Sequence, residues 1–217
     1  ALPISQKVGM TLRKMREIEG DQRQVPCLVH SDLSVVDEEL KLQQESFFYS
    51  SMLRPDRDPL HYLVIQNIVT GCTMMINHAL WQLAVLPCDE SAMRMHDMWF
   101  ALIASSLGRI GFVNRPTMLY RQHSGNVVGA KNVRSLRYIA AAFSRLRQNR
   151  ESIRQCQRQA GALADTLGDR LRAEQRALLT AYADCAGQSK FARWRVIFKY
   201  RIWLLGWRRK IAELLLI

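Results

Sequence analysis

The sequence predicts an α/β fold, in which a partial, mixed sheet with flanking helices is followed by a basic, all-helical tail. Up to about residue 130, short apolar runs that contain β-branched residues alternate with segments of helical periodicity. From Lys131 onward, apolar residues recur only at helical intervals. The 217 residues, with 48% hydrophobic content, suffice for one sizeable core. We therefore expect two parts, 1–130 and 131–217.

The first elements are a helix and a short strand. Ser5 can cap a helix that Gly20 ends, and this helix would carry one apolar face: Val8, Leu12, Met15 and Ile18. The apolar run 25–30 predicts a buried strand that the polar pair Ser31–Asp32 interrupts. Residues 49–61 are rich in Pro, Asp and Arg, which is typical of a loop.

The next segment is apolar and surrounds a glycine. Residues 63–77 carry β-branched side chains on both sides of Gly71, which predicts one or two strands with a turn at the glycine. A short helix is expected over 78–84.

A second helix and two further strands complete the predicted α/β part. The helix begins at Asp97 and ends at Gly108, a residue type common at helix ends. Strands are expected over 110–113 and 117–122, with a bend at Arg115–Pro116 between them.

The charge of the chain is concentrated in its second part. The formal net charge is +12, and two segments hold most of the excess. Residues 131–160 contain eight Lys or Arg against one Glu, and residues 187–217 again contain eight against one. Such an excess indicates an anionic partner, which includes phosphates of a substrate, a lipid surface and nucleic acid.

The cysteines and the hydropathy narrow the class of protein. The five cysteines are odd in number and form no CxxC pair, which argues against a disulfide framework and a zinc ribbon and favours a cytoplasmic location. No run of eighteen apolar residues occurs, so no membrane-spanning helix is expected.

Three blocks of sequence could carry chemistry. Residues 69–77 (VTGCTMMIN) contain the glycine turn, residues 95–99 (MHDMW) place an acidic residue at a helix start, and residues 120–123 (YRQH) end a strand with a histidine. A carboxylate at a helix N-terminus is kept ionised by the dipole and can remove a proton from a hydroxyl. Aspartate is also a preferred N-cap, so Asp97 could equally serve only to cap the helix.

Together, the three blocks resemble the acceptor-side half of a bacterial family 2 glycosyltransferase of the GT-A fold. The resemblance covers about residues 1–131 and is most specific over 66–131. It implies inverting transfer of a sugar from a nucleotide-sugar donor to a glycan or lipid-linked acceptor, in the assembly of surface polysaccharide or O-antigen. It also implies a divalent metal, Mg or Mn, most of whose ligands lie in a nucleotide-sugar domain upstream of this sequence. We therefore expect this chain alone to be inactive.

The resemblance assigns roles to individual residues. Asp97 would be the catalytic base, and His96 would shape the acceptor pocket beside it. His123 would approach the metal or the diphosphate, and Arg121 could pair with phosphate, although each could also be an ordinary surface residue. The residues assigned to the substrate are Thr70, Gly71, Cys72, His96, Trp99, Arg121 and Gln122.

Asp32 is a further acidic residue near a strand, but it does not fit the metal motif. The sequence Asp32-Leu33-Ser34 has no second carboxylate until Asp37. We therefore expect Asp32 to be a turn residue at the end of its strand.

The tail contains an aromatic and aliphatic stripe with basic flanks. Its members step by three and four residues along a predicted helix: Phe191, Trp194, Phe198, Ile202 and Leu205. Such a helix can lie in a membrane interface, which predicts a cytoplasmic protein peripherally associated with the inner membrane. The same stripe could instead pack on the core with solvated basic flanks.

A non-catalytic binding module for anionic membrane or nucleic acid is the second hypothesis for the chain, because the tail is so basic. The basic residues are not organised as a helix-turn-helix, a zinc finger or an RNP motif, so nucleic acid is not an expected partner.

Overall fold

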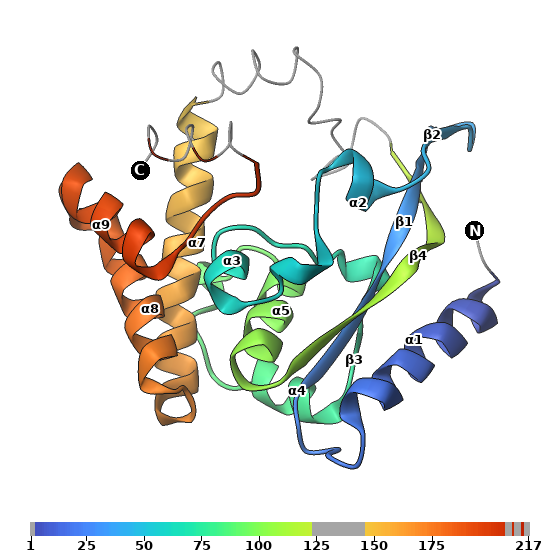
Figure 1. Cartoon of the computed structure of the whole chain (residues 1–217), viewed down its shortest axis with the longest axis horizontal. Helices are drawn as coiled ribbons and strands as arrows, with labels where there is room; N and C mark the ends of the chain where they lie inside the picture. Colours follow the sequence, from blue (N-terminus) through green and yellow to red (C-terminus); the bar gives the residue numbers. More distant parts are fainter. Residues whose placement is uncertain (1–2, 123–145, 207–209, 211–213, 215–217) are drawn as a thin grey trace.

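The computed structural model describes residues 3–122, 146–206, 210 and 214, and it shows an α/β fold built on a small mixed sheet (Figure 1). The sheet contains β1 (Cys27–Val36), β2 (Leu42–Gln44), β3 (Met75–Ile76) and β4 (Arg109–Arg121). β1 pairs antiparallel with β2 and β3 and parallel with β4. The predicted α/β class with a mixed sheet is thus confirmed.

Helices of very different length accompany the sheet. The long ones are α1 (Ile4–Glu19), α5 (His96–Leu107), α7 (Leu146–Leu167), α8 (Ala173–Asp184) and α9 (Lys190–Tyr200). The short ones are α2 (Phe47–Ser50), α3 (Leu60–Leu63) and α4 (His78–Ala84). The expected helix over 78–84 is confirmed, and Gly108 ends α5 as predicted.

The two faces of β1 are covered by different helices because alternate side chains point to opposite sides of a strand. Cys27 and Val29 pack with Met15 of α1, whereas Leu28 belongs to the larger core that includes α5. The predicted apolar face of α1 is only partly correct. Val8 and Leu12 are exposed, and the buried residues of this helix are Thr11 and Met15.

β1 continues through Ser31 and Asp32, so the predicted break and the predicted turn at Asp32 are wrong. Both polar side chains find partners inside the fold. Ser31 Oγ lies 2.7 Å from Thr117 Oγ1. Asp32 accepts hydrogen bonds from the backbone N–H groups of Leu33 (2.8 Å) and Phe48 (3.1 Å) and from the Ser46 hydroxyl (2.5 Å). A buried carboxylate satisfied in this way does not have to end its strand.

β4 is likewise one strand rather than two. The bend expected near Pro116 is accommodated as irregularities in the parallel pairing, between Ser31 and Asp32 and between Asp32 and Ser34 of β1. A bulge of this kind lets a strand pass a proline without ending.

The segment 63–77 contains far less strand than predicted. Only Met75–Ile76 pairs with β1, and Gly71–Thr73 forms a turn of 3-10 helix. Asn67 is one local reason, because its side chain accepts from the N–H of Val69 and donates to the carbonyl of the same residue, both at 2.9 Å. Such side-chain bonds to nearby backbone compete with strand pairing.

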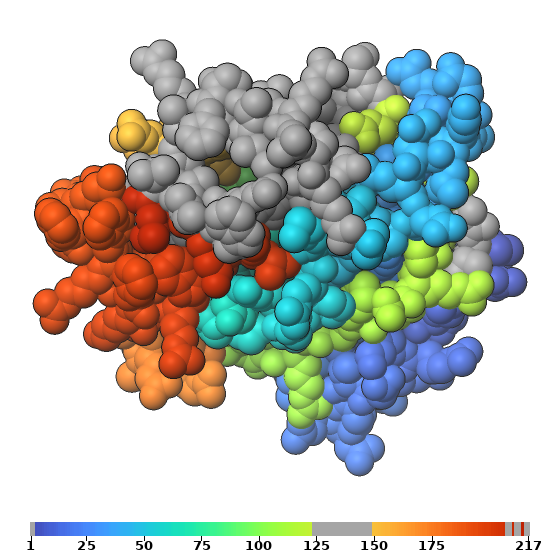
Figure 2. Space-filling view, turned by 45° about the horizontal axis from the view of Figure 1, so that its top comes forward, coloured from blue at the N-terminus to red at the C-terminus, as the bar shows by residue number. Residues whose placement is uncertain are grey.

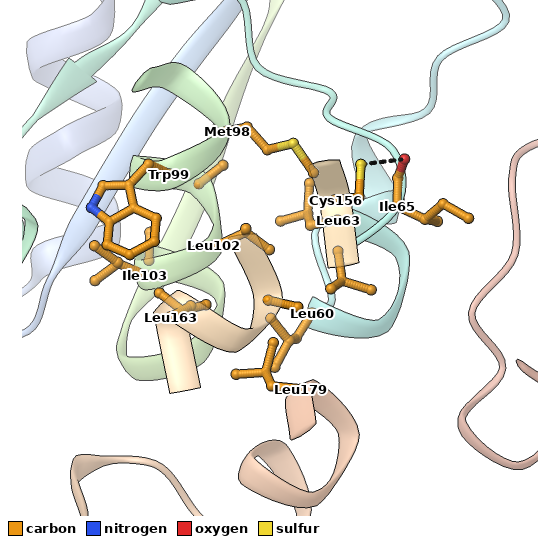
Figure 3. Close-up of a cluster of buried hydrophobic side chains, with 14 of the residues drawn as sticks. Leu60, Leu63, Ile65, Met98, Trp99, Leu102, Ile103, Cys156, Leu163 and Leu179 are labelled. Carbon is orange, nitrogen blue, oxygen red and sulfur yellow. Dashed lines mark hydrogen bonds between the residues drawn. The ribbon is translucent and has the colours of Figure 1, made fainter. Parts of the chain in front are cut away.

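The helices beyond residue 146 share the core of the α/β part. Figure 3 shows Leu163 of α7 beside Leu102 and Leu179 of α8 beside Leu60, and the Cys156 thiol donates to the carbonyl of Ile65 at 3.8 Å. The expected boundary at 130/131 lies outside the described residues. Residues of α7 and α8 belong to the same hydrophobic core as residues of α3 and α5.

The predicted stripe of the tail is divided by the end of α9. Arg201 adopts the left-handed conformation, with φ 54°, directly after Tyr200. Ile202 is then fully buried in the main core, while Phe191 and Phe198 are exposed. In the part of the chain that the structure describes, no helix has both the length and the apolar character needed to cross a membrane.

His30 is a buried imidazole in the middle of β1. We expect it to make the stability of the fold sensitive to acid. Among the residues that the structure describes, neither ring nitrogen has a hydrogen-bond partner, and the rings of Phe112 and Phe48 lie 5.0 and 5.6 Å away. Burial lowers the pKa of His30 from 6.5 to about 4. The unfolded chain therefore takes up this proton at a higher pH than the folded chain does. The contribution of His30 to the free energy of unfolding is complete above about pH 6.5 and falls by about 3 kcal/mol as the pH approaches 4.

Urea unfolding of the wild type and of His30→Leu between pH 7 and pH 4 would measure this loss, because all other titrating groups are common to both proteins. We expect the wild type to lose stability more steeply than the variant below about pH 6.5. Parallel curves for the two proteins would contradict the assignment to His30.

Candidate functional site

The turn at Gly71–Thr73 meets the first turn of α5, and Asp97 lies at the junction. Asp97 is the second residue of α5 and is 6% exposed. Its Oδ2 accepts a hydrogen bond from the backbone N–H of Gly71 at 3.0 Å. Its Oδ1 accepts from the Asn67 amide at 3.0 Å and from the N–H of Met98 at 2.7 Å. Three N–H donors thus hold one carboxylate at a helix N-terminus, where negative charge is stabilised.

Asp97 is not the capping residue of α5. The N-cap position is Met95, which offers no side-chain hydrogen bond. Two of the three donors to Asp97 come from residues about thirty positions earlier in the chain, at 67 and 71. The carboxylate therefore fastens the glycine turn to the helix, which exceeds what a simple cap does.

His96 lies directly against the glycine turn. A β-carbon at Gly71 would be 2.5 Å from His96 Nε2 and 3.6 Å from Asp97 Oδ2. Only a glycine leaves room for the imidazole in this position. His96 is itself exposed. Its Nε2 and Asp97 Oδ2 both border the small volume that a β-carbon at Gly71 would occupy.

Lys7 and Asn67 are two residues of this site that the sequence did not reveal. The Lys7 ammonium donates to the Cys72 carbonyl at 2.6 Å and lies 3.8 Å from Met118 Sδ. Lys7 comes from α1, so only the folded structure brings it to the turn. Asn67 had one signal in the sequence, because Gln66–Asn67 is the polar interruption of an otherwise apolar run.

The thiol of Cys72 is influenced by the charges of Lys7 and Asp97. Desolvation by the surrounding protein raises its pKa and the negative charge of Asp97 adds to the effect, whereas Lys7 and a backbone hydrogen bond lower it. The net shift is upward, so the thiol is protonated at neutral pH and is a poor nucleophile. Cys72 can line the site as a small polarisable group rather than attack a substrate.

The structure brings together Thr70, Gly71, Cys72, His96 and Asp97 from the predicted set. Thr70 takes part through its carbonyl, which accepts from both the N–H and the hydroxyl of Thr73 at 2.8 Å.

The structure places Trp99, which the resemblance assigns to the substrate, away from the surface. The residue is 2% exposed within the main core, and its ring N–H donates to the carbonyl of Ala84 at 3.4 Å. The physical reason is helical spacing: Trp99 lies two positions after Asp97, on the side of α5 that the core covers.

Arg121 and Gln122 lie at the far end of β4. Arg121 is opposite Val36, and the N–H of Gln122 donates to the Val36 carbonyl at 2.8 Å. The β4 residue described next to the turn is Met118, whose Sδ lies 3.8 Å from the Lys7 ammonium, three positions before Arg121. His123 lies outside the described residues.

The residues around Asp97 do not make a metal site by themselves. Within the described ranges, no group of three or more His, Cys, Asp or Glu side chains is placed to hold a metal ion. Both Asp97 oxygens accept hydrogen bonds from N–H donors.

Comparisons with family models, curated proteins and solved structures found no match for this chain.

Proposed function

We propose that this chain is the acceptor-side part of an inverting glycosyltransferase, with Asp97 as the general base. The observation that carries the proposal is the buried carboxylate held by three N–H donors at the start of α5, next to the exposed His96. In such a transfer, an acceptor hydroxyl attacks the anomeric carbon of the donor sugar while the nucleotide diphosphate leaves from the opposite face. The hydroxyl proton must go to a nearby base.

The hydrogen bonds indicate which oxygen of Asp97 would take the proton. A carboxylate oxygen has two lone pairs. Oδ1 accepts two hydrogen bonds, from Asn67 and Met98, and so uses both. Oδ2 accepts one, from Gly71, and retains a lone pair beside the volume that His96 borders. We therefore assign Oδ2 as the proton acceptor and His96 as a neighbour that can bond the acceptor sugar.

The sheet offers a place for the donor-binding part of such an enzyme. β4 has 13 residues, and in the described part of the chain it pairs only with β1. The edge of a strand presents backbone N–H and C=O groups that can pair with a further strand. A parallel strand of a nucleotide-sugar-binding domain could add at the other edge of β4, and the divalent metal, Mg or Mn, would belong to that domain. The proposed acceptor is a glycan or lipid-linked sugar of the cell surface, and the proposed location is the cytoplasmic side of the inner membrane.

A titration of the isotopically labelled 217-residue chain with oligosaccharides tests the acceptor assignment. We expect the amide signals of Gly71, Cys72 and Met98 to shift on binding, because these groups surround Asp97. The variant Gly71→Ala should reduce the shifts, because its β-carbon displaces His96, whereas Gly9→Ala on α1, where nothing lies within 4 Å of the new β-carbon, should not.

The same chain should not hydrolyse or transfer nucleotide sugars by itself, because no donor site is assigned to its described residues. Release of nucleoside diphosphate by the purified chain, measured with a coupled assay, would contradict that expectation. Oligosaccharide shifts that cluster away from the Gly71 turn would contradict the acceptor site.

A further inference from the structure

The outward face of α9 combines exposed aromatic rings with cations. Phe191 is 80% exposed and Phe198 is 58% exposed. They are seven residues apart, which is two helical turns, so they lie on the same side of the helix about 10 Å from each other. Arg195 falls between them on that side and is exposed. The opposite side of α9 packs inward through the buried Ile197 and through Val196 and Tyr200.

The two exposed rings are supported by neighbouring aromatic residues. Phe191 meets Trp194 edge to face at 5.7 Å, and Phe198 meets Trp203 in the same manner at 4.9 Å. The Lys190 ammonium lies over the Trp194 ring at 5.4 Å. The rings are therefore held in defined positions on the outside of the helix, which reduces the conformational entropy that binding would cost.

The segment that carries this face contains basic residues and no acidic residue. Residues 187–206 contain no Asp or Glu, and Lys190, Arg195, Lys199 and Arg201 are all exposed. Within the described part of the chain, none of these four forms a salt bridge. α9 lies at the outer edge of the molecule, on the side opposite α1 (Figure 1). In the space-filling view, the orange-red C-terminal helices form one flank and the blue α1 the other (Figure 2).

We infer that this face of α9 docks on an anionic lipid surface, with Phe191 and Phe198 entering the headgroup region and the cations meeting lipid phosphates. Exposed rings among cations match the chemistry of a bilayer interface, where apolar and charged groups are satisfied at different depths. A protein partner would have to desolvate the same cations beside the rings, which is costly unless each is paired. This face contains fewer residues than the stripe predicted from the sequence, because Ile202 follows the end of α9 and is buried in the core. This inference does not depend on the glycosyltransferase proposal.

Sedimentation of the 217-residue chain with vesicles tests this inference. Vesicles of phosphatidylcholine with phosphatidylglycerol should bind the chain, and vesicles of phosphatidylcholine alone should bind it much less. Replacing Arg195 and Lys199 by Gln should weaken binding by about twenty-fivefold, since each cation near the surface contributes about fivefold. Replacing Phe191 and Phe198 by Ser should weaken binding by about tenfold or more. High salt should reduce wild-type binding strongly.

A matched control uses the exposed apolar residues of α1. The double variant Val8→Ser, Leu12→Ser also removes two exposed apolar side chains from a helix, but on the opposite side of the molecule. It should bind vesicles as the wild type does. All four substituted positions of the aromatic and control pairs are exposed, so each variant should stay folded, which circular dichroism would verify.

Three outcomes would overturn the inference. The first is unchanged binding in the α9 variants, and the second is an equal loss in the α1 control. The third is binding to a single-stranded oligonucleotide that is as strong as binding to the vesicles and equally dependent on Phe191 and Phe198, which would identify nucleic acid as the occupant.

Discussion

Replacing Gly108 with alanine is expected to destabilise the chain by roughly 3 kcal/mol or more. A β-carbon at this position would lie 1.7 Å from the carbonyl oxygen of Pro26 and 2.6 Å from its carbonyl carbon. Both are backbone atoms, so no side-chain rotation can relieve the overlap. The neighbouring N–H of Arg109 donates to the same Pro26 oxygen at 2.9 Å, at the start of the β1–β4 pairing. The substitution therefore forces β1 and β4 apart.

Urea and thermal unfolding would measure this loss, and Gly9 provides the control. Gly9 lies within α1, and a β-carbon there would meet nothing within 4 Å. Gly9→Ala should raise the stability by about 0.5–1 kcal/mol, because alanine favours the helix over glycine. A Gly108→Ala variant that unfolds at the same urea concentration as the wild type would show that Pro26 can move away.

Gly108 also shows which structural features can be predicted from the sequence and which depend on the fold. The pattern of residues correctly predicted that α5 ends there. The need for glycine comes from Pro26, which lies eighty-two positions earlier and touches Gly108 only because β1 and β4 pair in parallel. Local patterns report helix ends and apolar faces, but the close approach of distant backbones depends on the whole fold.

The errors in predicted strands have the same origin. Ser31 and Asp32 predict a break, since polar residues in a buried strand are costly without partners. Their partners are Thr117, Ser46 and Phe48, none of which could be identified from the sequence around β1. The reverse error occurred over 63–77, where apolar and β-branched residues predicted strands but Asn67 and the 3-10 turn hold most of the backbone away from the sheet.

The residues of the candidate site that are close together in the sequence could be predicted. Those that the fold brings together from distant parts of the chain could not. A carboxylate at a helix start and a glycine turn are visible as motifs, and the structure places Asp97 beside Gly71. The contribution of Lys7 depends on the packing of α1 against the turn. Trp99 belongs to the same motif as Asp97, yet its ring points into the core, which a motif alone does not reveal.

The second expected result with a large effect concerns Asp97 in an enzyme that also contains the donor-binding part. If Asp97 is the general base, Asp97→Asn should lower kcat by about 10²–10⁴-fold while leaving donor binding nearly unchanged. The amide nitrogen introduced by the substitution would also face N–H donors, namely Gly71 if it takes the place of Oδ2, or Asn67 and Met98 if it takes the place of Oδ1. We therefore expect a loss of about 1–3 kcal/mol in stability as well.

Asp32→Asn is the control that separates the two effects. Asp32 is 4% exposed, against 6% for Asp97, and its carboxylate likewise accepts bonds from two backbone N–H groups and one side chain. Asp32→Asn should cost less stability than Asp97→Asn in urea unfolding, because the Ser46 hydroxyl at Oδ2 of Asp32 can accept from the new amide, whereas all the partners of Asp97 are N–H donors. Only Asp97→Asn should lower kcat by this factor, since Asp32 lies in β1 and holds α2 rather than the glycine turn. Equal losses of kcat in the two folded variants would mean that Asp97 acts through stability alone and that the base is another residue.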